Sequence, residues 1–176
     1  MANGVIKKVA VVAQNIDAYN RSAKINAEVQ NGSCLSLSGL VTTAGETEVW
    51  TGVTPATATL GELWMVATPE VVVTDGKYKG LDPDPRNFVN SANDILDVFK
   101  PQVGDIIILT ADAVGGTKST NTFVVATDGE LKLQWGASAV SGLSLKLREE
   151  TSISIGTGAI GSHKVTAYKF EVVAVA

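Results

Sequence analysis

The sequence predicts a mainly β protein, a single-domain barrel or sandwich, from its composition and from the spacing of its apolar segments. Val, Ile and Thr make up 50 of the 176 residues, and β-branched side chains favour strands over helices. Short apolar segments recur at intervals of roughly 8–12 residues with Gly, Ser and Thr between them, as in sandwiches and barrels. We expect residues 1–13 to form an N-terminal arm or edge strand and residues 14–176 one β-rich domain.

The expected strands follow the apolar segments along the chain. Residues 5–13 are an edge strand or arm, and residues 14–30 have no clean periodicity and receive no assignment. Residues 102–110 are expected to form a turn that leads into a central strand, because four consecutive apolar residues suit burial on both faces. The other expected strands are 34–40, 46–53, 62–67, 70–74, 122–127, 130–135, 143–147, 151–155 and 165–175. In 130–135 and 143–147 the apolar residues alternate, which places them on one face.

One helix is expected over residues 85–99. Its apolar residues share one helical face at spacings i, i+4, i+7, i+8 and i+11: Phe88, Ala92, Ile95, Leu96 and Phe99. Asp84 is a suitable N-cap, Pro85 suits the first helical position, and Pro101 ends the helix soon after Phe99. The helix is expected to cover one end of the β core.

Two Asp-Gly pairs, Asp75-Gly76 and Asp128-Gly129, each follow a β-branched run. Asp-Gly between apolar runs predicts a tight hairpin, because Gly accepts positive φ. We therefore expect a hairpin at each of them.

Two glycine-rich segments resemble nucleotide-binding motifs but lack the required context. Gly156-Thr-Gly158-Ala-Ile-Gly161 matches G-x-G-x-x-G, yet a strand rather than a helix follows it, and the dinucleotide motif requires a helix. Gly115-Gly-Thr-Lys-Ser119 places Thr117 before Lys118, where a phosphate-binding loop needs Gly, and a strand again follows. Both are expected to be loops between strands, with 112–121 and 156–162 as the most exposed tips.

The remaining reactive side chains also have ordinary structural explanations. Asp82 and Asp84 each precede a proline and lack the ligand spacing of a calcium loop, so turn formation and capping account for them. His163 is the only histidine and Cys34 the only cysteine, which excludes a histidine-based triad and a Cys-rich zinc site. Glu149 and Glu150 are adjacent and would point to opposite faces of a strand. We predict no catalytic, cofactor-binding or metal-binding residues, and no enzymatic activity.

Composition limits the partners. The net charge of −4 and a pI near 5.0 disfavour nucleic-acid binding. No apolar run approaches the length that spans a bilayer, and the N-terminus lacks a secretory signal, so no membrane partner is expected. Only 18% of the residues are charged and the mean hydropathy is +0.19, so we expect other subunits to cover part of the surface.

Three stretches resemble a family of small virion proteins encoded in the structural modules of tailed bacteriophages and prophages of Gram-positive bacteria. They are Tyr78-Lys-Gly-Leu-Asp-Pro-Asp-Pro-Arg-Asn-Phe88, Phe99-Lys-Pro-Gln-Val-Gly-Asp-Ile106 and Lys118-Ser-Thr-Asn-Thr-Phe-Val-Val-Ala126. The similarity runs from about residue 9 to the C-terminus. It implies a capsid decoration protein that is made in the host cytoplasm, binds the major capsid protein on the outer head surface and stabilises the lattice. Homo-oligomers are also implied, with trimers at local three-fold axes as one arrangement.

Two alternatives stay open from the sequence. A tail-tube or baseplate component would form rings without a capsid. A receptor-binding virion module would bind glycan through Trp50, Trp64 and Trp135, together with Tyr78 and Tyr168. Each tryptophan lies in an apolar or alternating stretch, so packing in the core or at a subunit interface is the favoured role.

Overall fold

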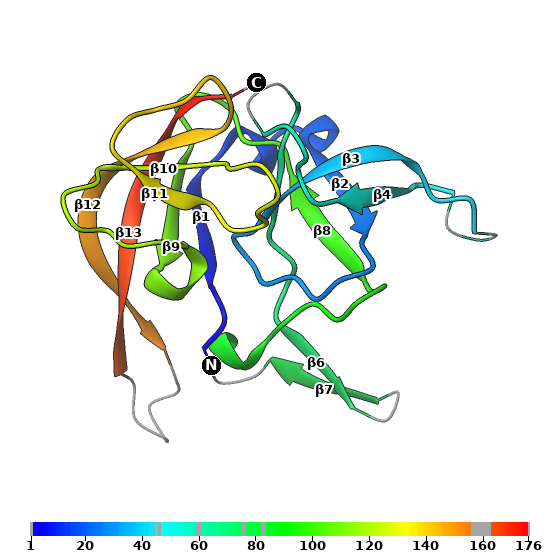
Figure 1. The fold of residues 1–176 in the computed structure, drawn as a ribbon. Helices are drawn as coiled ribbons and strands as arrows, with labels where there is room; N and C mark the ends of the chain where they lie inside the picture. Colours follow the sequence, from blue (N-terminus) through cyan, green and yellow to red (C-terminus); the bar gives the residue numbers. More distant parts are fainter. Residues whose placement is uncertain are drawn as a thin grey trace.

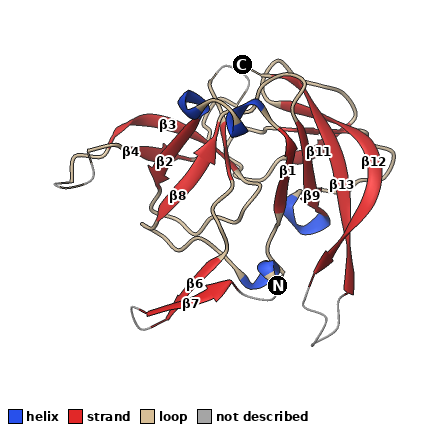
Figure 2. Cartoon of the chain, turned by 180° about the vertical axis from the view of Figure 1, so that it is seen from behind, coloured by secondary structure: helices blue, strands red, loops and turns tan. Residues whose placement is uncertain are grey.

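The computed structural model is built from β-strands and short 3-10 turns (Figures 1 and 2). It describes residues 2–43, 45, 47–58, 61–74, 77–81, 84–155 and 163–175, and of residues 71–74, 77–81 and 163 the backbone alone. Within these ranges there are thirteen strands, four 3-10 turns and no α-helix. No helix in this part of the chain is long and apolar enough to cross a membrane.

Strands and 3-10 turns are numbered separately, each in chain order. The strands are β1 (Ile6–Ala10), β2 (Asn20–Lys24), β3 (Cys34–Leu40), β4 (Val49–Val53), β5 (Trp64–Val66), β6 (Val71–Thr74), β7 (Lys77–Leu81), β8 (Ile95–Phe99), β9 (Ile106–Thr110), β10 (Phe123–Val125), β11 (Gln134–Gly136), β12 (Ser144–Ile155) and β13 (His163–Ala174). The 3-10 turns are η1 (Val12–Gln14), η2 (Asp17–Tyr19), η3 (Pro85–Asn87) and η4 (Ala111–Ala113).

The strands form a closed barrel beside an antiparallel sheet (Figure 1). The barrel has the order β2-β4-β3-β5-β8, and β2 pairs with β4 in parallel and with β8 antiparallel. The sheet has the order β1-β9-β13-β12-β10-β11. The prediction of a mainly β fold is confirmed. The first segment is an edge strand, since β1 lies at the end of this order and pairs with β9.

The strand β5 and the adjoining ends of β3 and β8 are buried on both faces, and we call these three strands the shared wall. Their side chains alternate between two hydrophobic cores, as the two-residue period of a strand requires. Those facing the barrel interior are Leu35, Trp64, Val66, Leu96 and Val98. Those facing the six-stranded sheet are Cys34, Met65 and Phe99, which pack with residues of β9, β10, β12 and β13. The shared wall therefore joins the barrel to the sheet.

Two hairpins extend beyond the barrel and the six-stranded sheet: the distal ends of β12 and β13, and the separate two-stranded sheet of β6 and β7. In β12 and β13 the paired register runs from Ser144↔Ala174 to Ile155↔His163, whereas β9 pairs with β13 only over Ala167–Glu171. The distal part of β12 and β13 is therefore a two-stranded ribbon (Figure 2). The segment Gly156–Gly161 between these strands lies outside the described residues. In the other hairpin, Thr74 of β6 pairs with Lys77 of β7, and Asp75-Gly76 between them also lies outside.

The expected helix over residues 85–99 is wrong. Only η3 is helical there, and Asp84 caps it by accepting the Arg86 backbone N–H at 3.0 Å. Asn93 then adopts a φ of 68°, which breaks a helix, and its N–H donates to the Ile25 carbonyl at 2.7 Å. Beyond this turn the chain forms β8, in which Ile95 is 50% exposed. The apolar spacing of this segment fits a helix, but the Asn93 bond to Ile25 and the pairing of β8 with β2 make it a strand.

Several strand predictions need smaller corrections. Residues 143–147 and 151–155 belong to one strand, β12, with a register shift between Leu147 and Glu149. Of residues 130–135, only the last two lie in β11. Leu131 packs against the barrel core and Leu133 against the other core, so these residues do not share one face. The Asp128-Gly129 pair does not form a two-residue turn. It lies in a longer connection between the paired strands β10 and β11, where the Gly129 N–H donates to the Pro55 carbonyl at 2.7 Å.

The shared wall leads to a prediction about stability. Phe99 is 1% exposed between the wall and the sheet, whereas Ile95 on the same strand is half exposed. Phe99→Ala is expected to lower the free energy of unfolding by about 3–5 kcal/mol, through lost burial and a residual cavity. The matched change Ile95→Ala is expected to cost less than about 1 kcal/mol. Urea denaturation followed by circular dichroism measures both, and similar losses in the two variants would contradict the assignment of the core.

A candidate cleft at the junction of barrel and sheet

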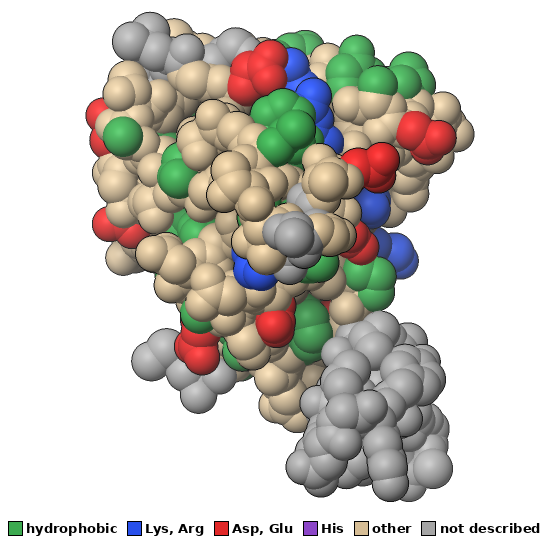
Figure 3. Space-filling model, turned by 90° about the vertical axis from the view of Figure 1, so that its right-hand side faces the viewer, with side chains coloured by type: hydrophobic (Ala, Val, Ile, Leu, Met, Phe, Trp, Pro, Cys, Tyr) green, Lys and Arg blue, Asp and Glu red, His purple; other side chains and the backbone are tan. Residues whose placement is uncertain are grey.

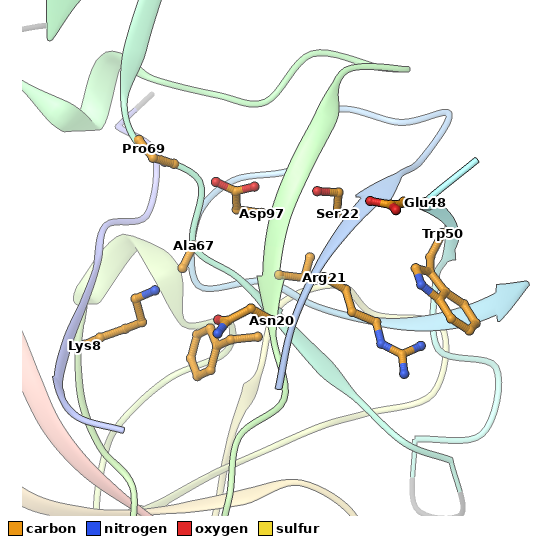
Figure 4. A pocket seen from close by; sticks show the side chains of 11 residues that line it. Lys8, Asn20, Arg21, Ser22, Glu48, Trp50, Ala67, Pro69 and Asp97 are labelled. Carbon is orange, nitrogen blue, oxygen red and sulfur yellow. The ribbon is translucent and has the colours of Figure 1, made fainter. Parts of the chain in front are cut away.

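A cleft of about 620 Å³ opens where β1 approaches the barrel strands β2, β4 and β8 (Figure 4). Its polar side chains come from several elements: Lys8, Asn20, Arg21, Ser22, Glu48 and Asp97. Its apolar part consists of Trp50, Ala67, Pro69, Val98 and Phe99. This volume lies within the range of small-molecule sites, and a location between two packed units is common for them.

Arg21 stacks on two tryptophans at the edge of the barrel core. Its guanidinium carbon lies 4.0 Å from the ring centroid of Trp50 and 4.8 Å from that of Trp64. The register explains this position, because Arg21 pairs with Val98 and lies two residues before Ala23, and both of those side chains belong to the barrel core. A guanidinium over an indole face gains cation–π attraction and buries apolar area. Arg21 thus covers the barrel core beside the cleft.

The charged groups of the cleft do not neutralise one another. Among the described residues, Lys8, Arg21, Glu48 and Asp97 form no ion pair within 4.0 Å. The Lys8 ammonium instead lies 5.5 Å from the Phe99 ring centroid. In Figure 4 the Asp97 and Glu48 carboxylates lie on the side of Ser22, and the Arg21 guanidinium extends toward Trp50. The cleft therefore offers cationic hydrogen-bond donors and carboxylate acceptors.

Two kinds of catalytic arrangement are absent from the described residues around the cleft. Its ionisable groups have no hydrogen-bonded nucleophile beside them, which covalent catalysis needs. Among the described residues no group of three or more His, Cys, Asp or Glu side chains could hold a metal ion. The charged, polar and apolar side chains of the cleft can offer hydrogen bonds and apolar contacts to a ligand.

The reactive side chains considered in the sequence analysis lie in separate parts of the molecule. Cys34 is fully buried in the core between barrel and sheet, where burial raises the pKa of its thiol to about 12. Glu150 pairs with Lys118 at 2.6 Å, and Glu149 lies 3.9 Å from Lys169. The side chain of His163 lies outside the described part.

The glycine- and proline-rich segments have structural roles where they are described. Gly115 forms a parallel bridge with Gln134, Gly116 has a φ of 74°, and β10 follows. The carboxylate of Asp84 holds the Arg86 side chain at 2.7 Å, and Asp82 lies outside the described residues.

The three tryptophans do not form one platform. Trp64 is 2% exposed inside the barrel. Trp135 packs edge-on against Tyr168, with ring centroids 5.2 Å apart, and against Phe170 at 5.7 Å. Trp50 alone of the three lines the cleft.

Sequence reasoning missed the cleft. Arg21, Ser22 and Asn20 lie in the segment that received no strand assignment, and Lys8 and Asp97 come from distant strands. The only local signal is a cationic residue two positions before a buried alanine, which is too weak to identify a site.

Comparison with protein-family models, with curated proteins and with solved structures finds no match to this chain.

The raised thiol pKa predicts how stability depends on pH. The folded state keeps Cys34 protonated up to about pH 12, whereas the unfolded thiol ionises near 9.0. The stabilisation is full below pH 9 and is lost as the pH rises toward 12, by on the order of 1 kcal/mol per pH unit. Cys34→Ala is expected to show a shallower loss in urea denaturation at pH 9 to 11. Equal slopes in the two proteins would contradict this assignment.

The contact of Arg21 with Trp50 and Trp64 predicts that replacing Arg21 lowers the stability of the protein. Arg21→Met keeps an apolar stem but removes the cation, and is expected to lower the free energy of unfolding by about 1–2 kcal/mol. Arg148→Met is the matched control, because Arg148 is largely exposed and its Nε donates to Glu171 Oε2 at 2.6 Å. An exposed ion pair contributes about 0–1 kcal/mol. Thermal denaturation followed by circular dichroism measures both, and a larger loss for Arg148→Met would refute the role of the stack.

Proposed function

We propose that this protein is a virion structural protein of a tailed bacteriophage, a decoration protein that binds the outer surface of the head and reinforces the major capsid lattice. The observation that carries the proposal is the resemblance of residues 78–88, 99–106 and 118–126 to small head-associated proteins. A lattice protein acts through contact surfaces and needs no catalytic centre. Many copies of a modest contact also bind strongly together.

Of the described residues in the resembling stretches, Phe99 alone lines the cleft. Residues 99–106 connect β8 to β9, and within them Asp105 is 2% exposed. Its carboxylate accepts the backbone N–H groups of Val12 at 2.9 Å and of Gln102 at 2.8 Å. Residues 78–88 lead from β7 into η3, and residues 118–126 lead into β10. These roles agree with a structural protein family.

Exposed apolar side chains also support the proposed binding to a capsid surface. One group consists of Val9 on β1, Val12 in η1, Ile16 shortly after η1, and Val103 in the turn between β8 and β9. A hydrogen bond from the Val12 backbone N–H to Asp105 links this turn to η1. Another lies on barrel strands: Leu40, Val53 and Ile95. On the barrel side, hydrophobic atoms form separate patches among polar ones (Figure 3). Such residues suit contacts with other subunits, whose interfaces bury apolar area.

Cosedimentation with purified heads tests the proposal. The protein is expected to bind mature, expanded heads of the phage that carries its gene at a saturating, fixed stoichiometry. Decorated heads are expected to release their DNA at a higher temperature than bare heads. Recovery of the protein in tails, with none on heads, would overturn the proposal in favour of a tail-tube or baseplate role.

Paired variants identify the contacting surface in the same assay. Val12→Asp with Val103→Asp places charge on the first exposed group, and Val53→Asp with Ile95→Asp places it on the second. A loss of head binding by at least about tenfold is expected for one pair, because a buried unpaired charge is costly. Unchanged binding by both pairs would contradict the argument from the exposed apolar residues.

A further inference from the structure

We propose that the cleft between β1 and the barrel binds a neutral saccharide. This inference goes beyond the proposed structural role and rests on the side chains of the cleft alone. The observation that carries it is a set of cations and carboxylates, unpaired with one another, around an apolar and aromatic surface.

The charges favour a ligand that both donates and accepts hydrogen bonds. Arg21 and Lys8 can only donate, and ionised Glu48 and Asp97 can only accept. A sugar hydroxyl does both, so neighbouring hydroxyls can bond to a cation and to a carboxylate at once. Hydrogen bonds between charged and neutral groups are stronger than those between two neutral groups.

Two neutral polar groups add to this set. The Asn20 amide nitrogen donates to the Ala13 carbonyl at 2.6 Å, and no bond to its oxygen is found among the described residues. The Ser22 hydroxyl likewise has no partner in this part of the chain. Both lie on β2 and line the cleft, on the face of the strand opposite to that of the Arg21 side chain.

The apolar part of the cleft suits the carbon face of a sugar ring. Trp50 is half-buried and lines the cleft together with Ala67 and Pro69. The Arg21 guanidinium covers one face of the Trp50 ring, so a sugar would contact the remaining part of the ring, whose polarised surface attracts C–H groups. Polar groups for the hydroxyls and an apolar surface for the ring are therefore present in one cleft.

Part of the cleft is held in place before any ligand arrives. Arg21 is held over Trp50 and Trp64, and its guanidinium has no hydrogen-bond acceptor among the described residues. Asn20, Ser22 and Asp97 lie on paired strands, with Asn20 opposite Phe99 and Ser22 opposite Asp97. Groups that are ordered in the free protein lose little conformational entropy on binding.

A charged occupant fits less well. An anion would meet the carboxylates of Glu48 and Asp97, and a cation would meet Arg21 and Lys8. A like charge at close range opposes binding in either case. A neutral polyhydroxylated ring avoids both costs.

Titration of the whole protein by NMR tests the inference, with amide shifts as the readout. The neutral probes are maltotriose, cellotriose and N,N′,N″-triacetylchitotriose. The controls are trigalacturonate as an anionic sugar, chitosan trimer as a cationic sugar and a Gly-Ser octapeptide as a neutral peptide. At least one neutral trisaccharide is expected to bind saturably and to shift the amides of β2, β8 and Trp50.

Two matched pairs of variants assign the binding to the cleft. Asp97→Asn and Lys8→Ala are expected to weaken the affinity about tenfold or more, because each removes a charged hydrogen-bond partner. Asp94→Asn and Lys7→Ala are expected to leave it unchanged. Asp94 is exposed and outside the cleft, and Lys7 lies next to Lys8 on β1 but does not line the cleft.

Three results would overturn the inference: no binding by any neutral trisaccharide, tighter binding of a charged probe or the peptide than of every neutral sugar, or equal affinity in all four variants. Asp97 and Lys8 are on the surface, so the variants are expected to fold, and the dispersion of their NMR spectra verifies this. A failure of sugar binding would leave head binding untouched, since the cosedimentation assay reports the proposed structural role.

Discussion

Burial on both faces of β5 and of the adjoining ends of β3 and β8 is the constraint on which the rest of the structure depends. Each of these strands contributes alternate side chains to two cores, with Trp64 and Val66 in the barrel and Met65 between barrel and sheet. A single-residue shift in register would exchange the two sets, so a large indole would have to fit where Met65 packs. The wall thus fixes the barrel, its register and the position of the sheet together.

Buried polar side chains connect the loops to one another. Asn31 holds the chain after β5, accepting the Thr68 backbone N–H at 3.0 Å and donating to the Thr68 carbonyl at 2.8 Å. Gln30 accepts the Gly4 N–H at 2.8 Å, and Asn90 donates to the Val29 carbonyl at 2.9 Å. Every buried side-chain nitrogen or oxygen in the described residues has a partner. Satisfied networks of this kind specify one arrangement of loops, because an unpaired buried group is costly.

The cleft is a consequence of joining a barrel to a sheet. Where the edge strand β1 passes the barrel, side chains from β1 and β8 face the same space, and Arg21 covers the adjoining barrel core. Binding groups and core-covering groups are therefore neighbours on β2. The same junction places Phe99 beneath Lys8, so the polar surface and the hydrophobic core share a boundary.

The sequence by itself determined the β class, the near absence of helix outside one mistaken segment, and the position of most strands. β-branched residues and turn-forming residues act locally, which is why β3 coincides with the expected 34–40 segment. Only the tertiary structure decided between helix and strand at residues 88–99, because a bond from Asn93 to Ile25 links residues far apart in sequence. It also decided that Leu131 and Leu133 belong to different cores, and that Lys8, Arg21 and Asp97 line one cleft. Periodicity specifies which faces of a strand are apolar, whereas the partner of each face depends on how distant strands pair.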